Sequence, residues 1–192
     1  TARHPVLVLG SDVWLGGAED AARQTAQELR LPVIANGQAR GVLPRGHELL
    51  VTRARSVALR QADLVIVAGT PLDFRLGYGS FGPKDAPARV VHVADAPGGI
   101  ATHIPLAASA AGDLSAFFTA LAASGTRSGS GAGPTDPEWV PGLAEATRAG
   151  GALHASLKEG EGEGWSAHGN VSAPRLFVYW REVPLLTAFD QA

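Results

Sequence analysis

Residues 64–69 read Leu-Val-Ile-Val-Ala-Gly, and this short apolar run predicts the fold class of the chain. A strand that is apolar on both faces is typical of a parallel sheet covered by helices on each side. A second run of this kind, Pro-Val-Leu-Val-Leu at 5–9, ends at Gly10. Shorter runs predict further strands at 32–35, 89–93 and 104–107.

Segments with helical composition alternate with these strands, at 17–30, 53–62 and 114–123. Parallel strands need crossover connections of this kind. We therefore expect an α/β fold, a doubly wound, Rossmann-like and mostly parallel sheet of about five or six strands flanked by helices. We expect residues 1–123 to form this domain, 124–136 a flexible Gly/Ser-rich linker, and 137–192 a helical or irregular C-terminal tail.

Composition and charge exclude several classes of protein. Hydrophobic residues make up 45% of the 192 residues, which is too many for an intrinsically disordered chain. A net charge of −2 gives no general attraction to nucleic acid or acidic membranes. No apolar run approaches the ~18 residues that span a bilayer. The chain has no cysteine, and a cytoplasmic location is the simpler interpretation.

No catalytic or metal-binding motif is visible. The turn at 10–17 (GSDVWLGG) follows neither the dinucleotide-binding nor the P-loop pattern. No Ser lies in a G-x-S-x-G elbow, and the six His residues lack the spacing of metal ligands. We therefore predict no catalytic residue and no metal site within this chain.

Arginine is concentrated between positions 40 and 75, where six Arg face three acidic residues in a chain of net charge −2. Arg53 and Arg55 lie near the start of a predicted helix, where the helix dipole disfavours cations, and a bound phosphate would offset that cost. The alternative is that these are surface arginines paired with acidic residues elsewhere in the chain.

The ligands of doubly wound sheets bind beyond the carboxyl ends of the strands. Gly10 and Gly69 each follow a predicted strand, and such glycines either let backbone approach a ligand or serve tight turns. Asp95 follows the strand at 89–93, where a carboxylate can accept a hydrogen bond from a ribose hydroxyl or cap the next helix.

The same loops resemble those of a known family. Residues 36–44 (NGQARGVLP) with His47, 53–56 (RARS) and 62–65 (ADLV) resemble the middle domain of thiamine-diphosphate-dependent enzymes. The branch they resemble includes acetolactate synthase large subunits, oxalyl-CoA decarboxylase and 2-hydroxyacyl-CoA lyase. Residues 69–77 (GTPLDFRLG) resemble the family's G-x-R-F-D-D-R-type loop, and the likeness covers residues 3–123.

This resemblance implies a three-domain parent enzyme, a lyase or transferase, of which the chain would be the second domain. Thiamine diphosphate and Mg²⁺ would bind only to the other domains, whose activating glutamate and G-D-G…N motif do not occur here, so the chain alone would be inactive. In relatives, the middle domain binds FAD or ADP, or nothing, and helps to build the oligomer. The implied partners are therefore the other domains of the parent and further copies of it.

The resemblance also implies a nucleotide site, in which arginines hold the phosphates and Asp95 the ribose. Arg75 matches the second arginine of the family's loop, whereas Pro71 stands in place of the first and Ala94 in place of a strand-end aspartate. The candidate cofactor-binding residues are Gly10, Arg40, Arg53, Arg55, Gly69, Asp73, Arg75 and Asp95.

Two other hypotheses remain open at this point. Pro71 and Ala94 favour a structural or oligomerisation module whose nucleotide site has degenerated. The type of sheet also fits a stand-alone NAD- or FAD-binding domain. Because the chain starts at Thr1 without an initiator Met, we expect it to be a piece of a longer protein.

Overall fold

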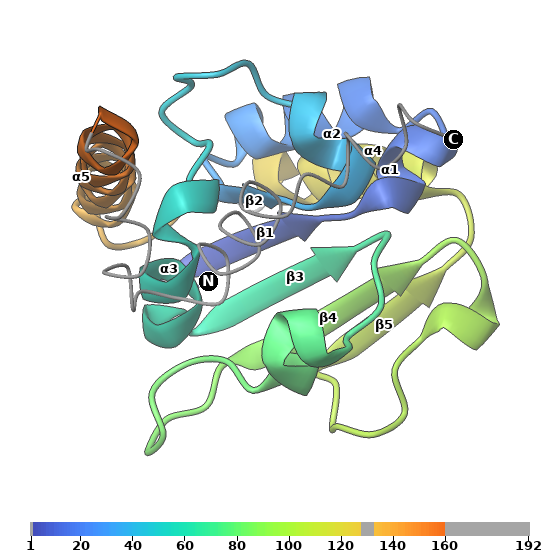
Figure 1. Cartoon of the computed structure of the whole chain (residues 1–192). Coiled ribbons are helices and arrows are strands. Elements are labelled where there is room, and N and C mark those ends of the chain that lie inside the picture. The colour runs from blue at the N-terminus through green and yellow to red at the C-terminus, as the bar shows by residue number, and fades with distance from the viewer. Residues whose placement is uncertain (1, 128–132, 160–192) are drawn as a thin grey trace, which may run out of the picture. The chain divides into compact units, whose positions relative to one another are not determined.

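The computed structural model describes residues 2–127 and 133–159. At its centre lies a parallel sheet of five strands in the order β2-β1-β3-β4-β5 (Figure 1). The predicted α/β fold with a doubly wound parallel sheet is therefore confirmed. The strands are β1 (Pro5–Leu9), β2 (Val33–Ala35), β3 (Leu64–Ala68), β4 (Arg89–Ala94) and β5 (Ala108–Ala111). The α-helices of the described residues are α1 (Ser11–Leu15), α2 (Glu19–Glu28), α3 (Arg55–Gln61), α4 (Leu114–Arg127) and α5 (Trp139–Glu159).

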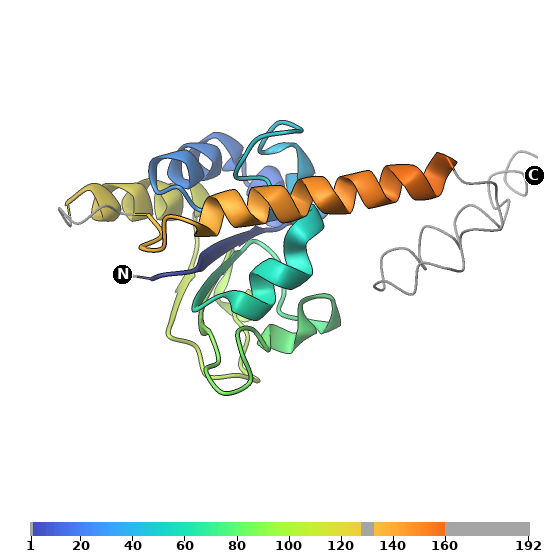
Figure 2. The ribbon, with the colours of Figure 1, turned by 90° about the vertical axis from the view of Figure 1, so that its left-hand side faces the viewer.

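Helices cover both faces of the sheet, which is why its central strands are apolar on both sides. On one face, Leu7 and Leu9 of β1 are buried together with residues of α2 and α4. On the other face, Val6 and Val8 are buried together with residues of α3 and the start of α5. Figure 2 shows α4 and α3 on opposite sides of the strands. Burial of one such Val or Leu side chain stabilises the fold by about 1.5–3 kcal/mol.

All five strands run in the same direction and end at one edge of the sheet. Leu9 of β1 pairs with Ala35 of β2 on one side and with Ala68 of β3 on the other. The chain therefore reverses the direction of strand addition at β1, and the loops after β1 and β3 leave the sheet next to each other. This is the position at which doubly wound folds bind ligands. We call it the carboxyl edge, and the opposite edge, where the strands begin, the amino edge.

The fifth strand was predicted at 104–107, and this prediction is wrong, because β5 lies at Ala108–Ala111. Ile104 and Leu106 instead pack from a loop against the core on the α3 face. Pro105 between them has no N–H to donate to a ladder. The true strand lies at the sheet's edge, and its Ala and Ser residues are mostly exposed, so it carries no apolar signal.

Two helices also differ from the predictions. Helix α1 occupies part of the turn that was expected to be a loop, and α4 continues through Arg127, so the first four residues of the expected linker at 124–136 are helical. Helix α5 forms at 139–159 despite Pro141 and the glycine pair at 150–151. The part of the predicted tail beyond residue 159 lies outside the described residues.

The chain divides into two compact units, residues 1–148 and 149–192. Within the first unit, the start of α5 joins the domain core. Trp139 is 5% exposed, and its indole N–H donates a hydrogen bond of 2.9 Å to the carbonyl of Pro5. Leu143, one turn later, is also buried in the core. Within the second unit, the described residues 149–159 are helical.

Candidate functional site

The candidate residues named from the sequence all lie on loops or helix starts at the carboxyl edge. Gly10 follows β1, Arg40 lies in a short 3₁₀ helix after β2, and Asp95 follows β4. Helix α3 runs back between β2 and β3, so its N-terminal end also lies at this edge. The remaining candidates are Arg53 and Arg55 at the start of α3, and Gly69, Asp73 and Arg75 after β3.

Glycine is needed at positions 10 and 69 because the loops that carry these residues contact each other. A Cβ atom at Gly10 would lie 2.1 Å from the carbonyl oxygen of Gly69. Gly69 itself has a φ of +68°, and a Cβ there would lie 2.9 Å from the amide nitrogen of Val13. The amide of Asp12 donates to the Gly69 carbonyl at 3.1 Å. These glycines therefore allow the loops after β1 and β3 to pack tightly.

Three candidates form a polar cluster, which we call the Asp73 cluster. The guanidinium of Arg75 donates to both carboxylate oxygens of Asp73, and its shortest contact, from Nη2 to Oδ2, is 2.6 Å. The side chain of Asp73 also accepts from the Arg75 amide at 2.9 Å. These contacts lower the pKa of Asp73. The guanidinium of Arg55 donates to the carbonyl of Arg75, and burial lowers its pKa against the opposing attraction of Asp73.

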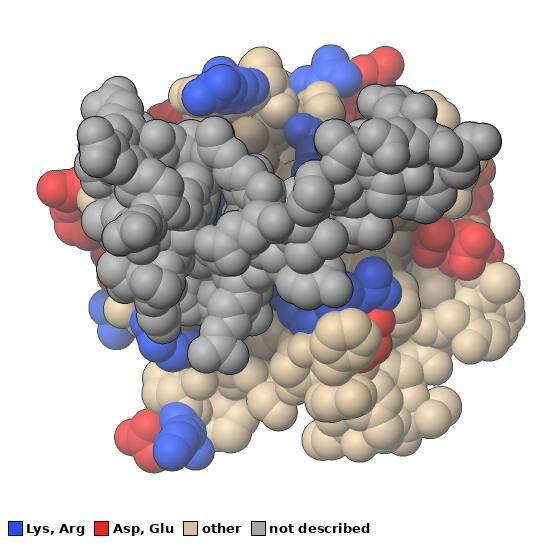
Figure 3. Space-filling model, in the orientation of Figure 1, with Lys and Arg blue, Asp and Glu red and all other residues tan. Residues whose placement is uncertain are grey.

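Arg40 and Arg53 are exposed and make no polar side-chain contact with any residue in the described ranges. They differ in this from Arg75, whose charge is already matched by Asp73. On the face that Figure 3 shows, basic atoms not covered by grey residues lie in several separate places, some of them beside acidic atoms. Among the candidate residues, Arg40 and Arg53 are therefore the arginines without a polar side-chain partner in the described part of the chain.

Asp95 has an acidic neighbour that the sequence analysis missed. Burial raises the pKa of Asp12, and the nearby carboxylate of Asp95 raises it further. The two carboxylates therefore lie close enough to repel each other, and this repulsion disfavours a phosphate near both of them. Carboxylates there are suited to accept hydrogen bonds from hydroxyl groups. Asp12 lies two residues after the glycine that ends a predicted strand, and this position could have indicated that it belongs to the same edge as Asp95.

A pocket of 490 Å³ opens between the loops after β3 and β4, and the sequence analysis did not identify it. The lining residues from the β3 loop include Pro71, Leu72, Asp73 and Tyr78. Residues 99–103 form the other wall. Pro71, which replaces an arginine of the family's loop, therefore gives this wall an apolar surface. The size of the pocket falls within the range of small-molecule sites, about 300–1,000 Å³.

His92 holds the two walls of this pocket together from below. It is 1% exposed, and its Nδ1 accepts a hydrogen bond of 3.0 Å from the amide of Ala101. Nδ1 therefore carries no proton, and Nε2–H donates to the carbonyl of Thr70 at 3.0 Å. Since Thr70 follows β3 and Ala101 follows β4, one buried side chain sets the spacing of both loops.

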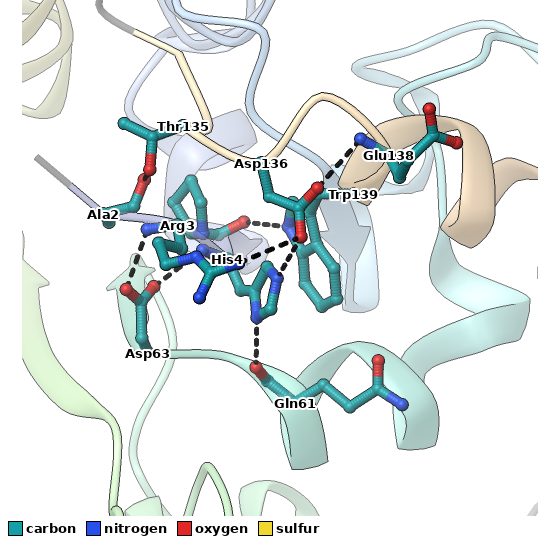
Figure 4. Close-up of polar contacts among 10 residues, drawn as sticks. Ala2, Arg3, His4, Gln61, Asp63, Thr135, Asp136, Glu138 and Trp139 are labelled. Atoms are coloured by element: carbon teal, nitrogen blue, oxygen red, sulfur yellow. Dashed lines mark hydrogen bonds and ion pairs between the residues drawn. The ribbon is translucent and has the colours of Figure 1, made fainter.

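A second polar cluster lies at the amino edge and has a structural role (Figure 4). The ring of His4 lies between Gln61 and Asp136, with 3.1 Å from Nδ1 to the Gln61 carbonyl and 2.8 Å from Nε2 to Asp136 Oδ2. The same ring stacks on Trp139, with 4.5 Å between the ring centroids. Asp63 accepts from two backbone amides at 2.8 Å each. We call this group the His4 cluster.

The His4 ring and the carboxylates of Asp63 and Asp136 all have hydrogen-bond partners within the domain. The hydrogen bond from His4 lowers the pKa of Asp136, and the amide of Glu138 lowers it further. A pocket of 320 Å³ lies beside the cluster, and its lining includes His4, Gln61, Asp136 and Trp139. The His4 cluster therefore ties β1, α3 and the start of α5 together.

The described residues contain no group of three or more His, Asp or Glu side chains that could hold a metal ion. None of the helices in the described ranges combines the length and apolar character needed to cross a bilayer. Neither finding adds a functional assignment.

The order and direction of the strands define a doubly wound α/β domain. Comparison with known proteins then identifies the family. The family model "Thiamine pyrophosphate enzyme, central domain" matches residues 1–121. This chain belongs to the family of central domains of thiamine pyrophosphate enzymes, as the loop motifs had indicated.

Individual relatives agree with this assignment. The acetolactate synthase large subunit IlvG of Mycobacterium tuberculosis is 42% identical over 149 residues, which cover 76% of this chain and 25% of the relative. The human 2-hydroxyacyl-CoA lyase 2 is 43% identical over 79 residues, or 41% of this chain and 12% of the relative. The chain thus spans about a quarter of the length of the first of these relatives.

One solved structure is also similar, the X-ray structure of a putative thiamin diphosphate-dependent enzyme from Mycobacterium smegmatis. It has a TM-score of 0.47 and 25% sequence identity, and the match covers 64% of this chain and 25% of that one.

The residues of this chain do not fit the thiamine cofactor itself. The sequence contains no G-D-G motif, and the described residues hold no acidic cluster for the Mg²⁺ of a diphosphate. At the carboxyl edge, the acidic pair Asp12 and Asp95 would repel a diphosphate placed between them. We therefore derive no step of thiamine chemistry from this chain.

Proposed function

We propose that this chain is the non-catalytic central domain of an acetolactate-synthase-like carboligase or decarboxylase that depends on thiamine diphosphate. The observation that carries the proposal is the family match over residues 1–121, together with 42% identity over 149 residues to two mycobacterial acetolactate synthases. The partners in this proposal are the other domains of the parent lyase or transferase and further copies of it. A cytoplasmic location stays a prediction from composition.

The absence of catalytic function is tested directly on the purified chain. We expect no acetolactate and no CO₂ when the chain is incubated with pyruvate, thiamine diphosphate and Mg²⁺. The physical reason is that this cofactor supplies the reactive carbanion, and the chain lacks the motifs that bind it. Turnover by the chain alone would overturn this part of the proposal.

The proposal includes an adenine nucleotide, ADP or FAD, at the carboxyl edge. Arg40 and Arg53 are exposed there and free of polar partners among the described residues, so they are available to phosphate. The pocket between the β3 and β4 loops offers room for the remainder of the ligand. Asp95 follows β4, and the resemblance implies that a carboxylate there contacts a ribose hydroxyl.

A thermal-shift assay with ADP, FAD, CoA and NAD tests this part. A ligand at 100 times its Kd stabilises the folded state by about 2.7 kcal/mol, which raises the melting temperature by several degrees. Arg53→Gln should reduce the shift with ADP or FAD. The matched control is Arg60→Gln, at the other end of α3, which should leave the shift unchanged.

The second candidate function is a structural module with a degenerate nucleotide site. It is favoured by the Asp73 cluster, in which the Asp73 carboxylate already forms an ion pair with Arg75, and by the apolar side chain of Pro71. It predicts no thermal shift with any of the four compounds, together with self-association detected by light scattering. A shift with NAD but not with ADP would instead favour a stand-alone dinucleotide-binding domain.

A further inference from the structure

We propose that His4 is a pH-sensitive switch at the amino edge. Its doubly protonated ring holds the segment before α5 to the end of α3, and loss of one ring proton weakens this attachment. The inference goes beyond the proposed function, because it involves neither a nucleotide nor thiamine chemistry. The residues that carry it are His4, Gln61, Asp136 and Trp139 (Figure 4).

Both nitrogens of the His4 ring face hydrogen-bond acceptors. Nδ1 lies 3.1 Å from the carbonyl oxygen of Gln61, and Nε2 lies 2.8 Å from Oδ2 of Asp136. A backbone carbonyl and an ionised carboxylate can only accept, so each contact needs a proton on the ring nitrogen. A neutral imidazole carries one proton and can make only one of these two bonds. The full set of contacts therefore requires the imidazolium form.

Two other histidines show the opposite arrangement. Nδ1 of His92 accepts from the amide of Ala101 at 3.0 Å, and Nδ1 of His47 accepts from the amide of Leu49 at 3.1 Å. A ring that accepts at one nitrogen needs a proton only on the other, so the neutral form suits both residues. His4 differs from them, and imidazole is the side chain that ordinarily gains or loses a proton between about pH 5 and pH 8.

The charged groups around the His4 ring come from each element that packs against it. On the segment before α5, Asp136 contacts the ring, and the exposed Glu138 lines the same pocket. Asp63, which follows α3, accepts from the His4 amide at 2.8 Å. From the chain before β1, the exposed Arg3 lies 3.9 Å from Oδ2 of Asp136. Three carboxylates and one guanidinium thus surround the ring, and this balance favours a positive charge on it.

The ring joins segments that are distant in the sequence. Gln61 ends α3, Asp136 precedes α5, and Trp139 begins α5. The rings of His4 and Trp139 stack at an interplanar angle of 27°. When the His4 ring loses one proton, one of its two hydrogen bonds is lost, whereas the bond from Trp139 to the Pro5 carbonyl remains. The attached state therefore binds more protons than the open state, and a rise in pH favours opening without unfolding the domain.

The experiment uses the full chain labelled with ¹⁵N, at about pH 5.5 and about pH 8, on either side of the ordinary imidazole titration. Long-range ¹H–¹⁵N NMR reports which nitrogens of the His4 ring carry a proton. Hydrogen exchange of the Trp139 indole N–H, which is bonded to the Pro5 carbonyl, reports how often the start of α5 opens. The amide of Val67 in the core strand β3 is the internal reference for global unfolding, and all rates are corrected for intrinsic exchange.

The test variant is His4→Phe, which removes both ring hydrogen bonds and keeps an aromatic ring to stack on Trp139. His4→Gln is a second variant that also lacks a titrating ring, in case His4→Phe does not fold. The matched control is His47→Gln, because His47 also bonds through both ring nitrogens but lies between α2 and the loop after β2.

We expect both nitrogens of His4 to be protonated at about pH 5.5 and one of them to lose its proton as the pH rises. Over this range, opening at Trp139 relative to Val67 should increase about tenfold, in keeping with the strength of one hydrogen bond from a charged group. The increase should disappear in His4→Phe and in His4→Gln. It should persist in His47→Gln.

The inference is overturned if the His4 ring carries a single proton at about pH 5.5, or if opening at Trp139 is the same at both pH values in the natural chain. An increase that persists in His4→Phe or His4→Gln would also overturn it, because another group would then be the cause. None of these measurements uses a nucleotide, so their failure and the failure of the proposed function are distinguishable.

Discussion

The two edges of the sheet differ in how many of their polar groups have a partner within the domain. At the amino edge, the His4 ring and the Asp136 carboxylate are partners at hydrogen-bonding distance, and Trp139, which stacks on His4, is buried. At the carboxyl edge, Arg40 and Arg53 are free within the described residues, and Asp12 faces the like charge of Asp95. Four large apolar side chains are also exposed there, Trp14, Leu15, Phe74 and Tyr78.

Within this one domain, the residues that stabilise the fold and the residues expected to bind a ligand therefore lie at different edges of the sheet. Paired and buried groups stabilise the fold, whereas free charges, exposed rings and like-charge contacts lower stability unless a ligand or partner engages them. The amino edge is therefore the structural side of the domain, and the carboxyl edge is where binding is expected. Four predictions test this contrast, two at each edge.

The largest effect is expected from Trp139→Ala at the amino edge. The change removes a buried indole and its hydrogen bond to Pro5, and should lower the free energy of unfolding by about 3–5 kcal/mol. The matched control is Trp14→Ala at the carboxyl edge, where the ring is 52% exposed and the change should stay within about 0.5 kcal/mol. Urea denaturation measures both. Equal losses would contradict the contrast and the inclusion of α5 in the domain core.

The next largest effect is expected from Gly10→Ala. The added Cβ would lie 2.1 Å from the Gly69 carbonyl, so the loops after β1 and β3 must separate, at a cost of about 1–3 kcal/mol. Gly41→Ala is the control, because a Cβ there has no neighbour within 4 Å. The shift of the urea midpoint distinguishes the two. A Gly10→Ala protein as stable as the natural chain would show that this close approach is not required.

A smaller, pH-dependent effect is expected from Asp136→Asn. The folded-state pKa of Asp136 is lowered by His4, so its ionised form stabilises the fold above the unfolded pKa of about 3.9, and this contribution is lost as the pH falls through the lowered value. Asp136→Asn should therefore destabilise the protein at about pH 7 and have little effect at about pH 3. Asp85→Asn, on an exposed loop, is the control at both pH values. An effect that does not change with pH would rule out the ion pair as its cause.

The smallest effect, of opposite sign, is expected from Asp12→Asn at the carboxyl edge. Burial and Asp95 raise the folded-state pKa of Asp12, so ionisation destabilises the fold at pH values above that pKa. Asp12→Asn should therefore slightly stabilise the protein at about pH 7, and the gain should vanish as the pH falls below the raised pKa. The same variant should strengthen ADP binding in the thermal-shift assay by removing a negative charge. A loss of stability at about pH 7 would contradict this account of the carboxyl edge.

The strands that cross the core could be predicted because they are apolar on both faces. The runs at 5–9 and 64–68 coincide with β1 and β3, whose neighbours on both sides are strands and whose two faces are covered by helices. Strand β5 could not be predicted in this way, because it lies at the edge of the sheet and its Ala and Ser residues are mostly exposed. Hydrogen bonding to β4 places it, and that pairing has no local signature in the sequence.

The sequence predicted where the candidate site lies, but not which of its charged side chains pair with one another. Strand-end glycines and the arginine-rich segment indicated the carboxyl edge, because all parallel strands end on one side. They did not indicate that Asp73 forms an ion pair with Arg75, or that the carboxylate of Asp95 raises the pKa of Asp12. The pocket at Tyr78 was missed, because its walls come from two loops that His92 joins across the sheet.

The sequence by itself determined the parallel α/β class, the edge at which a ligand would bind and the family of the domain, since these depend on local apolar runs and loop motifs. The tertiary structure alone decided which charges are paired and which are free, because hydrogen bonds and ion pairs join residues far apart in the chain. His4 and Asp136, 132 positions apart, are partners only because β1 and the segment before α5 meet at the amino edge. The difference between the amino edge and the carboxyl edge in how their charges are paired follows from those long-range contacts.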